Sequence, residues 1–152
     1  MSVSALKSMF EVIAVRDATA APMATETAHA TKGTDLDVTV PSTSICAAAQ
    51  ILDDARFTIE AVTGVDWIAE NQMEVVYDFT LFATGQRVTV RTRIPRDNPE
   101  LPTISCIYSG ANWHEREAHD FFGIVFIGHP NLSPFILPED SSFHPLRKDF
   151  TA

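Results

Sequence analysis

A strict alternation of hydrophobic and polar positions is the clearest pattern along this chain. It runs over residues 72–82, where every second residue is apolar or aromatic: Met73, Val75, Tyr77, Phe79 and Leu81. A period of two is typical of a β-strand, because successive side chains point to opposite faces of a sheet. Residues 87–94 alternate again, with Arg87, Arg91 and Arg93 on the polar face. Since residues 83–86 have turn composition, the two segments predict an antiparallel hairpin.

The register of this hairpin depends on the length of its loop. A two-residue loop at positions 84–85 places Leu81 opposite Val88 on the apolar face. It also places Asp78 opposite Arg91, as a cross-strand ion pair worth up to about 1 kcal/mol. A longer loop shifts the register, and a slip of one residue would turn the arginines toward the core. The arginines could form a ligand site, but the pattern favours the solvated outer face of a sheet.

The segments before the hairpin predict further elements. Residues 36–40 alternate as a strand does, and residues 59–68 have the composition of one. Between them, residues 42–53 predict a helix. Its apolar face consists of Ile45, Ala48, Ala49 and Leu52. Residues 4–15 fit either a helix or a strand. Residues 18–34, rich in Ala and Thr, are expected to be poorly ordered.

After the hairpin the chain becomes irregular. Three prolines make residues 95–102 a loop. Thr103 is expected to cap a short helix that continues to Tyr108.

Composition and charge exclude several classes of function. The 152 residues carry a net charge of −9, which argues against nucleic acid or an anionic membrane as a ligand. No apolar run approaches the roughly 18–20 residues that span a bilayer, and the first residues lack a secretory pattern. Cys46 and Cys106 lie far apart in the sequence and form no CxxC pair, so we expect reduced thiols rather than a disulfide framework.

A short helix with both ends marked is predicted over residues 113–122. Asn112 is a suitable N-cap, and Glu115 three residues later fits a capping box. Gly123 occupies the C′ position, where a left-handed residue ends many helices. About ten residues form only a marginal helix in isolation, so this one needs tertiary or partner contacts. One face combines aromatic and acidic side chains at helical spacing: Trp113, Glu117, Asp120 and Phe121.

Two kinds of chemistry could use the polar residues of this helix. The first is a metal site, but His114 and His119 are five residues apart, or about 140° around a helix, and cannot share one ion. The second is general acid–base catalysis, although no nucleophile, oxyanion hole or phosphate loop lies nearby. The candidates for it are Glu115, Glu117, Asp120 and His119.

A third interpretation fits the helix best. It is an ion-pair network at a protein–protein interface, in which Arg116 holds an acidic side chain of its own chain or of a partner. Asp120 is within reach of Arg116 at a spacing of four residues. Trp113 would anchor the contact.

The segment 111–132 resembles the signature of a known family. The matching residues are Ala111, Trp113, Glu115, Arg116, Glu117, Asp120, Gly123, Ile124, Phe126, Gly128, His129, Pro130 and Leu132. They resemble the 30 kDa subunit of respiratory complex I, the NADH:quinone oxidoreductase of respiratory chains. Residues 63–66, 75–77, 137–140 and 144–150 resemble the same family, so the resemblance covers roughly residues 36–150.

The resemblance implies an α+β fold. We expect two layers with a mixed β-sheet that contains the central hairpin (about 72–94), helices packed on one side and an irregular C-terminal tail. We also expect a poorly defined N-terminal segment (1–34), a single α+β domain (35–128) and an extended tail (129–152) that docks on partner subunits.

The resemblance also implies a function. The chain is expected to be a non-catalytic structural subunit, without a cofactor of its own, in the hydrophilic arm of a complex I-type NADH:quinone oxidoreductase. It would lie at the cytoplasmic side of the plasma membrane, against the large quinone-site subunit and iron–sulfur subunits. The residues expected to form the docking surface are Trp113, Glu115, Arg116, Glu117, Asp120, Gly123, Gly128, His129 and Pro130.

One departure from the family pattern keeps a related assembly open. After His129 and Pro130 the respiratory subunit usually continues Asp-Leu-Arg-Arg, whereas residues 131–134 here are Asn-Leu-Ser-Pro. Two arginines that would make charge-assisted contacts to a partner are therefore missing. The equivalent subunit of a membrane-bound energy-converting nickel–iron hydrogenase is one alternative. A small stand-alone enzyme using His119 and nearby carboxylates is the alternative from another class.

Overall fold

A mixed five-stranded sheet is the largest element of the computed structural model, which describes residues 2–16 and 23–151. Its strand order is β1-β2-β5-β4-β3. The strands are β1 (Met23–Glu26), β2 (Leu36–Thr39), β3 (Thr58–Trp67), β4 (Gln72–Leu81) and β5 (Gln86–Pro95). β2 is parallel to β5, whereas the other neighbouring pairs are antiparallel. This confirms the α+β fold with a mixed sheet.

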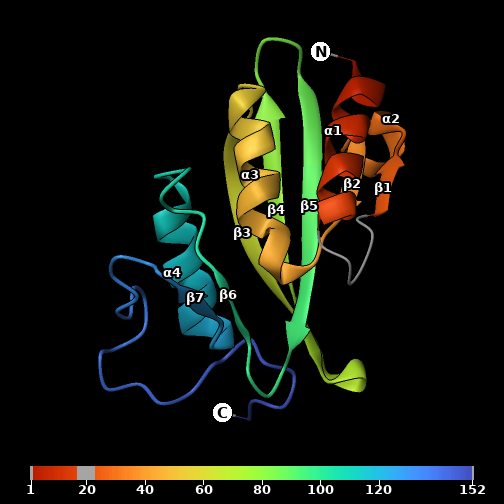
Figure 1. Ribbon diagram of the computed structural model, residues 1–152. Helices are drawn as coiled ribbons and strands as arrows, with labels where there is room; N and C mark the ends of the chain where they lie inside the picture. Colours follow the sequence, from red (N-terminus) through yellow and green to blue (C-terminus); the bar gives the residue numbers. More distant parts are fainter. Residues whose placement is uncertain (1, 17–22, 152) are drawn as a thin grey trace.

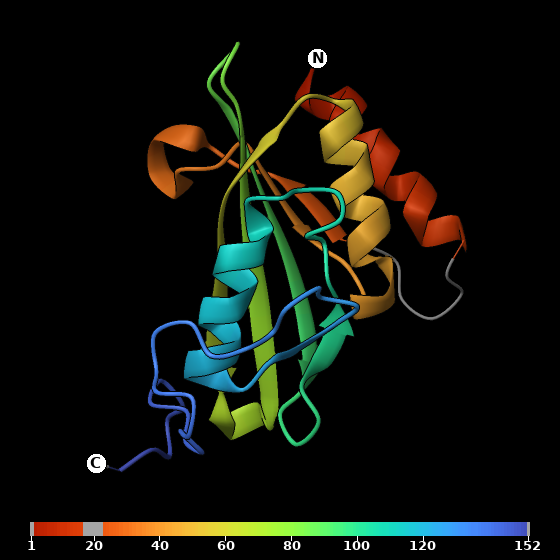
Figure 2. The ribbon, with the colours of Figure 1, turned by 90° about the vertical axis from the view of Figure 1, so that its left-hand side faces the viewer.

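Helices α1 (Val3–Arg16) and α3 (Ile45–Asp54) cover one face of the sheet (Figure 1). The short helix α2 (His29–Lys32) lies on the other side, as the view along the sheet in Figure 2 shows. Two 3-10 turns complete this part: η1 (Ser42–Ser44), which leads into α3, and η2 (Ile68–Glu70), which joins β3 to β4. The predicted apolar face of α3 is buried, as expected.

A smaller unit follows β5. Helix α4 (Ala111–Phe122) packs along β3, and β6 (Glu100–Pro102) pairs in parallel with β7 (Val125–Ile127). Residues 129–151, here called the tail, form turns and extended segments without a helix or strand. The tail crosses back over α4 in Figure 2.

The predicted hairpin exists, but its register was wrong by two residues. The turn has four residues, 82–85, because the N–H groups of Thr84 and Gly85 both donate to the carbonyl of Leu81. Asp78 therefore lies opposite Thr89, whose hydroxyl donates to its carboxylate at 2.8 Å. A shift of two residues leaves every side chain on its predicted face, so the core pattern survives the error.

The arginines of β5 form ion pairs on the outer face of the sheet. Arg91 contacts Asp37 of β2 at 3.0 Å rather than Asp78. Arg87 pairs with Glu60, and Arg93 pairs with Glu70. This paired arrangement agrees with the favoured interpretation of the arginines as an outer sheet face.

Three local expectations were wrong. Residues 103–108 form turns instead of a helix, although the Thr103 hydroxyl accepts from the Ser105 N–H as an N-cap would. The end of the proline loop becomes strand β6, because it pairs with β7. The described part of residues 18–34 contains β1 and α2, since β1 pairs with β2 at the sheet edge; residues 17–22 lie outside the described residues. The three-part division of the chain stays a prediction.

Gly64 of β3 allows α4 to approach the sheet closely. A Cβ atom at this position would lie 2.5 Å from Cδ2 of Phe122, on the last turn of α4. Contacts this short do not occur between real side chains, so any larger residue would push the end of α4 away. The carbonyl of Phe122 is in turn bound by the tail through Arg147. Gly64 therefore positions both α4 and the segment that follows it.

We predict that Gly64→Ala lowers the free energy of unfolding by about 1–3 kcal/mol, because the methyl group collides with Phe122. Gly110→Ala is the matched control, since residue 110 has φ −63° and its Cβ would lie 3.5 Å from Ile59, an ordinary contact. It should change stability by less than about 0.5 kcal/mol. Urea unfolding monitored by circular dichroism measures both. Equal losses in the two variants would contradict the close approach.

Candidate functional site

Helix α4 begins two residues earlier than predicted and lacks the predicted capping box. Gly110 occupies the N-cap, and Asn112 lies inside the first turn. Glu115 is fully buried: its carboxylate accepts hydrogen bonds from the Thr103 hydroxyl and, at 2.9 Å, from the Ile104 N–H. The end of the helix is as predicted, with Gly123 left-handed at φ 73°. The sequence thus predicted the helix but not its N-cap. Glu115 cannot complete a capping box with Asn112, because its carboxylate is bound inside the protein by Thr103 and Ile104.

The side chains of α4 divide into three faces. Glu115 faces inward, together with Ala111 and Ala118. The face toward β3 carries His114, Glu117, Phe121 and Phe122. The face toward the tail carries Trp113, Arg116 and Asp120. The mixed face expected from the sequence is therefore split, because Glu117 and Phe121 lie toward the strand whereas Trp113 and Asp120 lie toward the tail.

His129 closes the inward face next to Glu115. Its Nδ1 accepts a hydrogen bond from the Asn131 N–H at 3.1 Å, which leaves the proton on Nε2. Nε2 lies 3.2 Å from the carbonyl of Asn112 and 3.8 Å from the Glu115 carboxylate. Burial lowers the pKa of His129. Burial also raises the pKa of Glu115 to about 7, against the two hydrogen bonds that favour its charged form.

Arg116 fastens the tail to the helix. Its guanidinium donates to the carbonyl of Ser133 at 3.1 Å and to that of Pro134 at 2.9 Å. The same group lies over the rings of Trp113 and Phe135, which are 5.1 Å apart. Among the described residues, no carboxylate lies within 4.0 Å of Arg116, so within this chain it binds backbone carbonyls, the Ser133 hydroxyl and two rings rather than Asp120. An acidic side chain of a partner stays a prediction.

Asp120 holds the next three residues of the tail. One oxygen of its buried carboxylate accepts from the N–H groups of Phe135 and Ile136 at 2.7 Å each, and from that of Leu137 at 3.2 Å. Burial alone would raise the pKa of Asp120, but the three N–H donors outweigh burial and hold this pKa below its usual value. The carboxylate is therefore charged at neutral pH and serves as an anchor for the backbone.

The last turn of α4 is completed by the tail. The four final carbonyls of a helix lack partners within it. Here the carbonyl of His119 accepts from Gly123, and that of Asp120 is bound by His144. Phe121 and Phe122 accept from the N–H of Leu146 and from the Arg147 side chain.

The end of the tail is bound to the main sheet through Arg96 and Asp66. Arg96, next to the end of β5, binds the carboxylate of Asp66 on β3 at 2.8 Å. It also binds Asp149 of the tail at 2.6 Å, and the N–H of Lys148 donates to Asp66 at 2.8 Å. The hydrogen bonds from Arg96 lower the pKa of Asp66 despite its burial. These residues form no local sequence motif; Asp66 and residues 147–149 lie only within segments that resemble the family.

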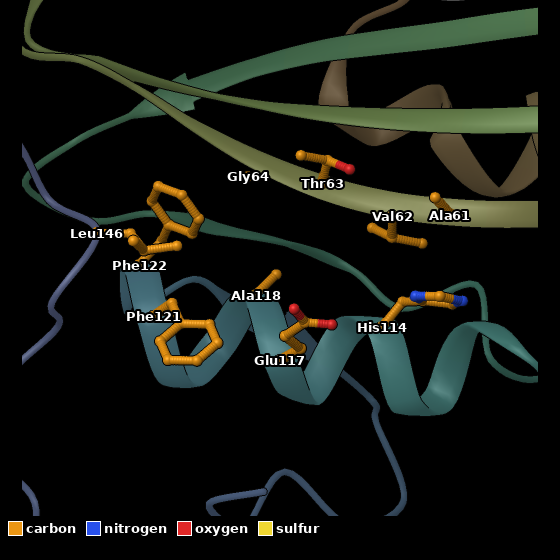
Figure 3. A pocket seen from close by; sticks show the side chains of 10 residues that line it. All are labelled: Ala61, Val62, Thr63, Gly64, His114, Glu117, Ala118, Phe121, Phe122 and Leu146. Carbon is orange, nitrogen blue, oxygen red and sulfur yellow. The ribbon is translucent and has the colours of Figure 1, made fainter. Parts of the chain in front are cut away.

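A groove of about 280 Å³ separates the outward part of α4 from β3 (Figure 3). Residues 61–64 of β3 form one wall, and the strand-facing side chains of α4 form the other. The Glu117 carboxylate points toward this space, with His114 on the same side of the helix. Leu146 closes one end.

Exposed apolar side chains concentrate on α4 and the tail. They are Trp113, Phe135, Ile136, Phe143, Leu146 and Phe150, each 37–55% exposed. Trp113 contacts Phe135, and the rings of Phe143 and Phe150 stack 5.6 Å apart. Large exposed apolar groups held in fixed positions are typical of surfaces that bind other proteins. Among the predicted docking residues, Trp113, Glu117 and Pro130 are exposed, whereas Glu115 and Asp120 are buried.

The acid–base candidates do not meet at one point. Glu115 is enclosed, and Asp120 is fully occupied by the backbone of the tail. His119 has its Nδ1 2.8 Å from the carbonyl of Ile124, while Glu117 opens into the groove. In the described part of the chain, no three His, Cys, Asp or Glu side chains are grouped so that they could hold a metal ion. Within the same residues, no helix has the length and hydropathy needed to cross a membrane.

The chain is similar in sequence to proteins of a known family. Residues 38–152 match the family model described as "Respiratory-chain NADH dehydrogenase, 30 Kd subunit". The C subunit of the NADH-quinone oxidoreductase of Roseiflexus sp. (strain RS-1) is 41% identical over 120 residues, which cover 76% of this chain and 69% of that protein. The C subunit of the F(420)H(2) dehydrogenase of Methanosarcina mazei is 38% identical over 91 residues, 59% of this chain and 58% of that one.

Two solved structures share the fold. A chain from the structure of the membrane-bound sulfane sulfur reductase, described as an archaeal respiratory membrane complex, superposes with a TM-score of 0.71 at 36% identity, covering 76% of this chain and 71% of that chain. A trypsin-resistant fragment of Nqo5 superposes with a TM-score of 0.64 at 27% identity, covering 84% of this chain and 98% of that chain. The region matched by the family model includes most of the sheet, α4 and the tail.

Glu115 predicts a pH-dependent stability. Its folded pKa of about 7 exceeds the ordinary value of 4.5, so protonation favours the folded state. This contribution is complete below pH 4.5 and is lost as pH rises through about 7. Relative to Glu115→Gln, which cannot titrate, the native chain should lose on the order of 3 kcal/mol between pH 4.5 and 8. Urea unfolding across this range measures the difference, with Glu117→Gln as the control for net charge. A pH-independent difference would contradict the prediction.

Asp120→Ala should free the tail, because three backbone N–H groups lose their charged acceptor. Hydrogen bonds to charged groups contribute about 1.5–3 kcal/mol each, so opening of residues 133–137 should become at least about tenfold easier. Chymotrypsin cleavage after Phe135, followed by mass spectrometry, measures this opening, since the Leu137–Pro138 bond resists the enzyme. Asp140→Ala, which removes an exposed tail carboxylate, should leave the cleavage rate unchanged. If both variants are cleaved alike, Asp120 is not the anchor.

Proposed function

Because the chain belongs to the family of the 30 kDa subunit of respiratory-chain NADH dehydrogenase, we propose that α4 and the tail form its docking surface for partner subunits. Membership makes the chain the 30 kDa-type subunit of a complex I-type NADH-quinone oxidoreductase, a component of a multisubunit respiratory complex. We infer that its role is structural: it holds neighbouring subunits in place and takes no part in electron transfer itself.

One observation carries this proposal. The apolar side chains of α4 and the tail are exposed, yet the backbone that presents them is fixed by Asp120, Arg116 and Arg96. A surface that only faced water would gain nothing from holding Trp113 and Phe135 in place. A binding surface gains affinity, because the conformational cost of binding has already been met by folding.

The related proteins support a structural rather than a chemical role. Their names refer to NADH-quinone oxidoreductase, to F(420)H(2) dehydrogenase and to sulfane sulfur reductase, so the reactions of their complexes differ. A subunit that took part in the chemistry would have to change with the reaction, whereas a docking subunit need not. We propose the large quinone-site subunit and the iron–sulfur subunits as its partners, at the cytoplasmic side of the membrane.

The docking residues have two distinct roles in this proposal. Trp113, Arg116, Glu117 and Pro130 would contact the partners, because their side chains reach the surface of α4 and the tail. Glu115, Asp120 and His129 would act indirectly, because they are buried and hold the surface in shape. Gly123 and Gly128 supply left-handed backbone at φ 73° and 84°.

The test separates assembly from folding. Trp113→Ala should change the unfolding free energy of the isolated chain by no more than about 1 kcal/mol, because this ring is 55% exposed. Arg116→Ala also frees part of the tail and should lower the unfolding free energy by about 1.5–3 kcal/mol. Each should reduce the recovery of the complex several-fold when tagged chain is purified with its partner subunits. Phe82→Ala is the control, since this ring is 72% exposed at the far end of the β4–β5 hairpin. Normal assembly of both α4 variants would overturn the docking role.

A further inference from the structure

The edge of β3 beside α4 has open backbone positions. β3 is the last strand of the sheet, so it pairs with β4 on one side only. Residues 61–64, four in succession, line the groove next to α4. Within the described chain, no backbone hydrogen bond other than those to β4 reaches these four residues. The N–H and C=O groups that point away from β4 therefore face the groove, as at any unpaired sheet edge.

The open edge has defined ends. A β-bulge at Glu60 interrupts the pairing between β3 and β4 just before Ala61, and a bulge bends the strand on its far side away. At the other end, the tail crosses Asp66, where the N–H of Lys148 is bound. About four residues of β3 remain open, or about 13 Å of extended chain at 3.3 Å per residue.

The opposite wall of the groove is apolar at one end and acidic near the middle. Phe121, Phe122 and Leu146 make the end near the tail apolar. Glu117 lies nearer the middle, and its carboxylate has no ion-pair or hydrogen-bond partner among the described residues. A segment that fills this groove would therefore gain from a basic side chain opposite Glu117 and an apolar one near Phe122.

We propose that the groove receives an extended segment of a partner subunit, which adds to β3 as a sixth strand and places a lysine or arginine opposite Glu117. This inference rests on the docking role proposed above and names the kind of contact made. Backbone hydrogen bonds to residues 61–64 supply the affinity, and the side-chain pockets select the segment. The close approach of α4 at Gly64 limits the space to an extended chain, because the groove of about 280 Å³ has no room for a helix about 10 Å wide.

A second copy of this chain is disfavoured as the occupant. Pairing of two β3 edges would bring two Glu117 carboxylates into the same interface. Each chain also carries a net charge of −9, so association of two copies is opposed by repulsion. The acidic balance favours a basic segment from a different subunit.

Site-specific cross-linking in the assembled complex tests the proposal. A photoreactive phenylalanine analogue is placed singly at Ala61, Thr63, Glu117 or Trp113, and captured residues are identified by mass spectrometry. Ala61 and Thr63 lie opposite Asp78 and Val76, and thus on the same face of the sheet. Captured partner residues should therefore lie two positions apart within one segment of about four residues, with the Glu117 cross-link in the same segment. Placement at Phe82 is the negative control.

The outcomes distinguish strand addition from docking in general. Captured residues three or four positions apart would indicate a helix, and residues from unconnected segments would indicate a mosaic surface; both overturn strand addition but leave docking intact. Capture at Trp113 with none at Ala61, Thr63 or Glu117 has the same meaning. Capture of a second copy of the chain overturns the choice of partner. If the analogue at Trp113 captures no partner residue either, both strand addition and the proposed docking function are contradicted.

A charge exchange tests the basic residue opposite Glu117. Glu117→Arg should reduce recovery of the complex at least fivefold, because it faces the partner's basic side chain with a like charge. Reversing the captured basic residue to Glu should restore recovery. Asp53→Arg, an exposed change of the same charge on α3, should have no effect. If the reversal does not restore assembly, the pairing is wrong.

Discussion

The shape of the outer surface depends on the contact between the end of α4 and the chain that follows it. A helix ends with four carbonyl groups that need partners, and in a short helix these four are a third of the total. Here Gly123, His144, Leu146 and Arg147 supply one donor each. The same hydrogen bonds supply donors to the helix carbonyls and hold the irregular tail in place. Neither segment would hold its form alone, since an isolated helix of this length is marginal.

Most charged groups on α4 bind partners within the chain. The Asp120 carboxylate accepts hydrogen bonds from three backbone N–H groups. The Arg116 guanidinium donates to two backbone carbonyls and lies over two rings. Glu115 is held between the Thr103 hydroxyl and the Ile104 N–H, with His129 beside it. Such contacts fix the backbone from within the chain. Since burying a charge is costly, Asp120 and Arg116 keep their charges through several partners, whereas burial raises the pKa of Glu115 and favours its protonated form.

The sequence predicted the elements with regular periodicity and missed contacts between distant residues. Alternation located β4 and β5 and assigned their faces correctly, because a two-residue slip preserves the pattern. It could not predict the four-residue turn, which depends on two N–H groups that share the Leu81 carbonyl. The Glu115 capping box failed for a similar reason: its partners, Thr103 and Ile104, lie outside any local motif. The family signature indicated the right helix, but no spacing rule shows that Asp66, Arg96 and Asp149 meet.

A tail that is ordered before binding loses less conformational entropy on association than a tail that folds on its partner. A disordered segment must lose its conformational freedom during association, which reduces affinity for a given buried area. In this chain most of that cost is met within the subunit, because residues 133–137 and 144–149 are bound to α4 and the sheet. Partner contacts can then be few and apolar, as the exposed rings of Trp113 and Phe135 suggest. Residues 133 and 134 stand where the family usually has two arginines, and in this chain Arg116 of the helix binds their backbone carbonyls instead.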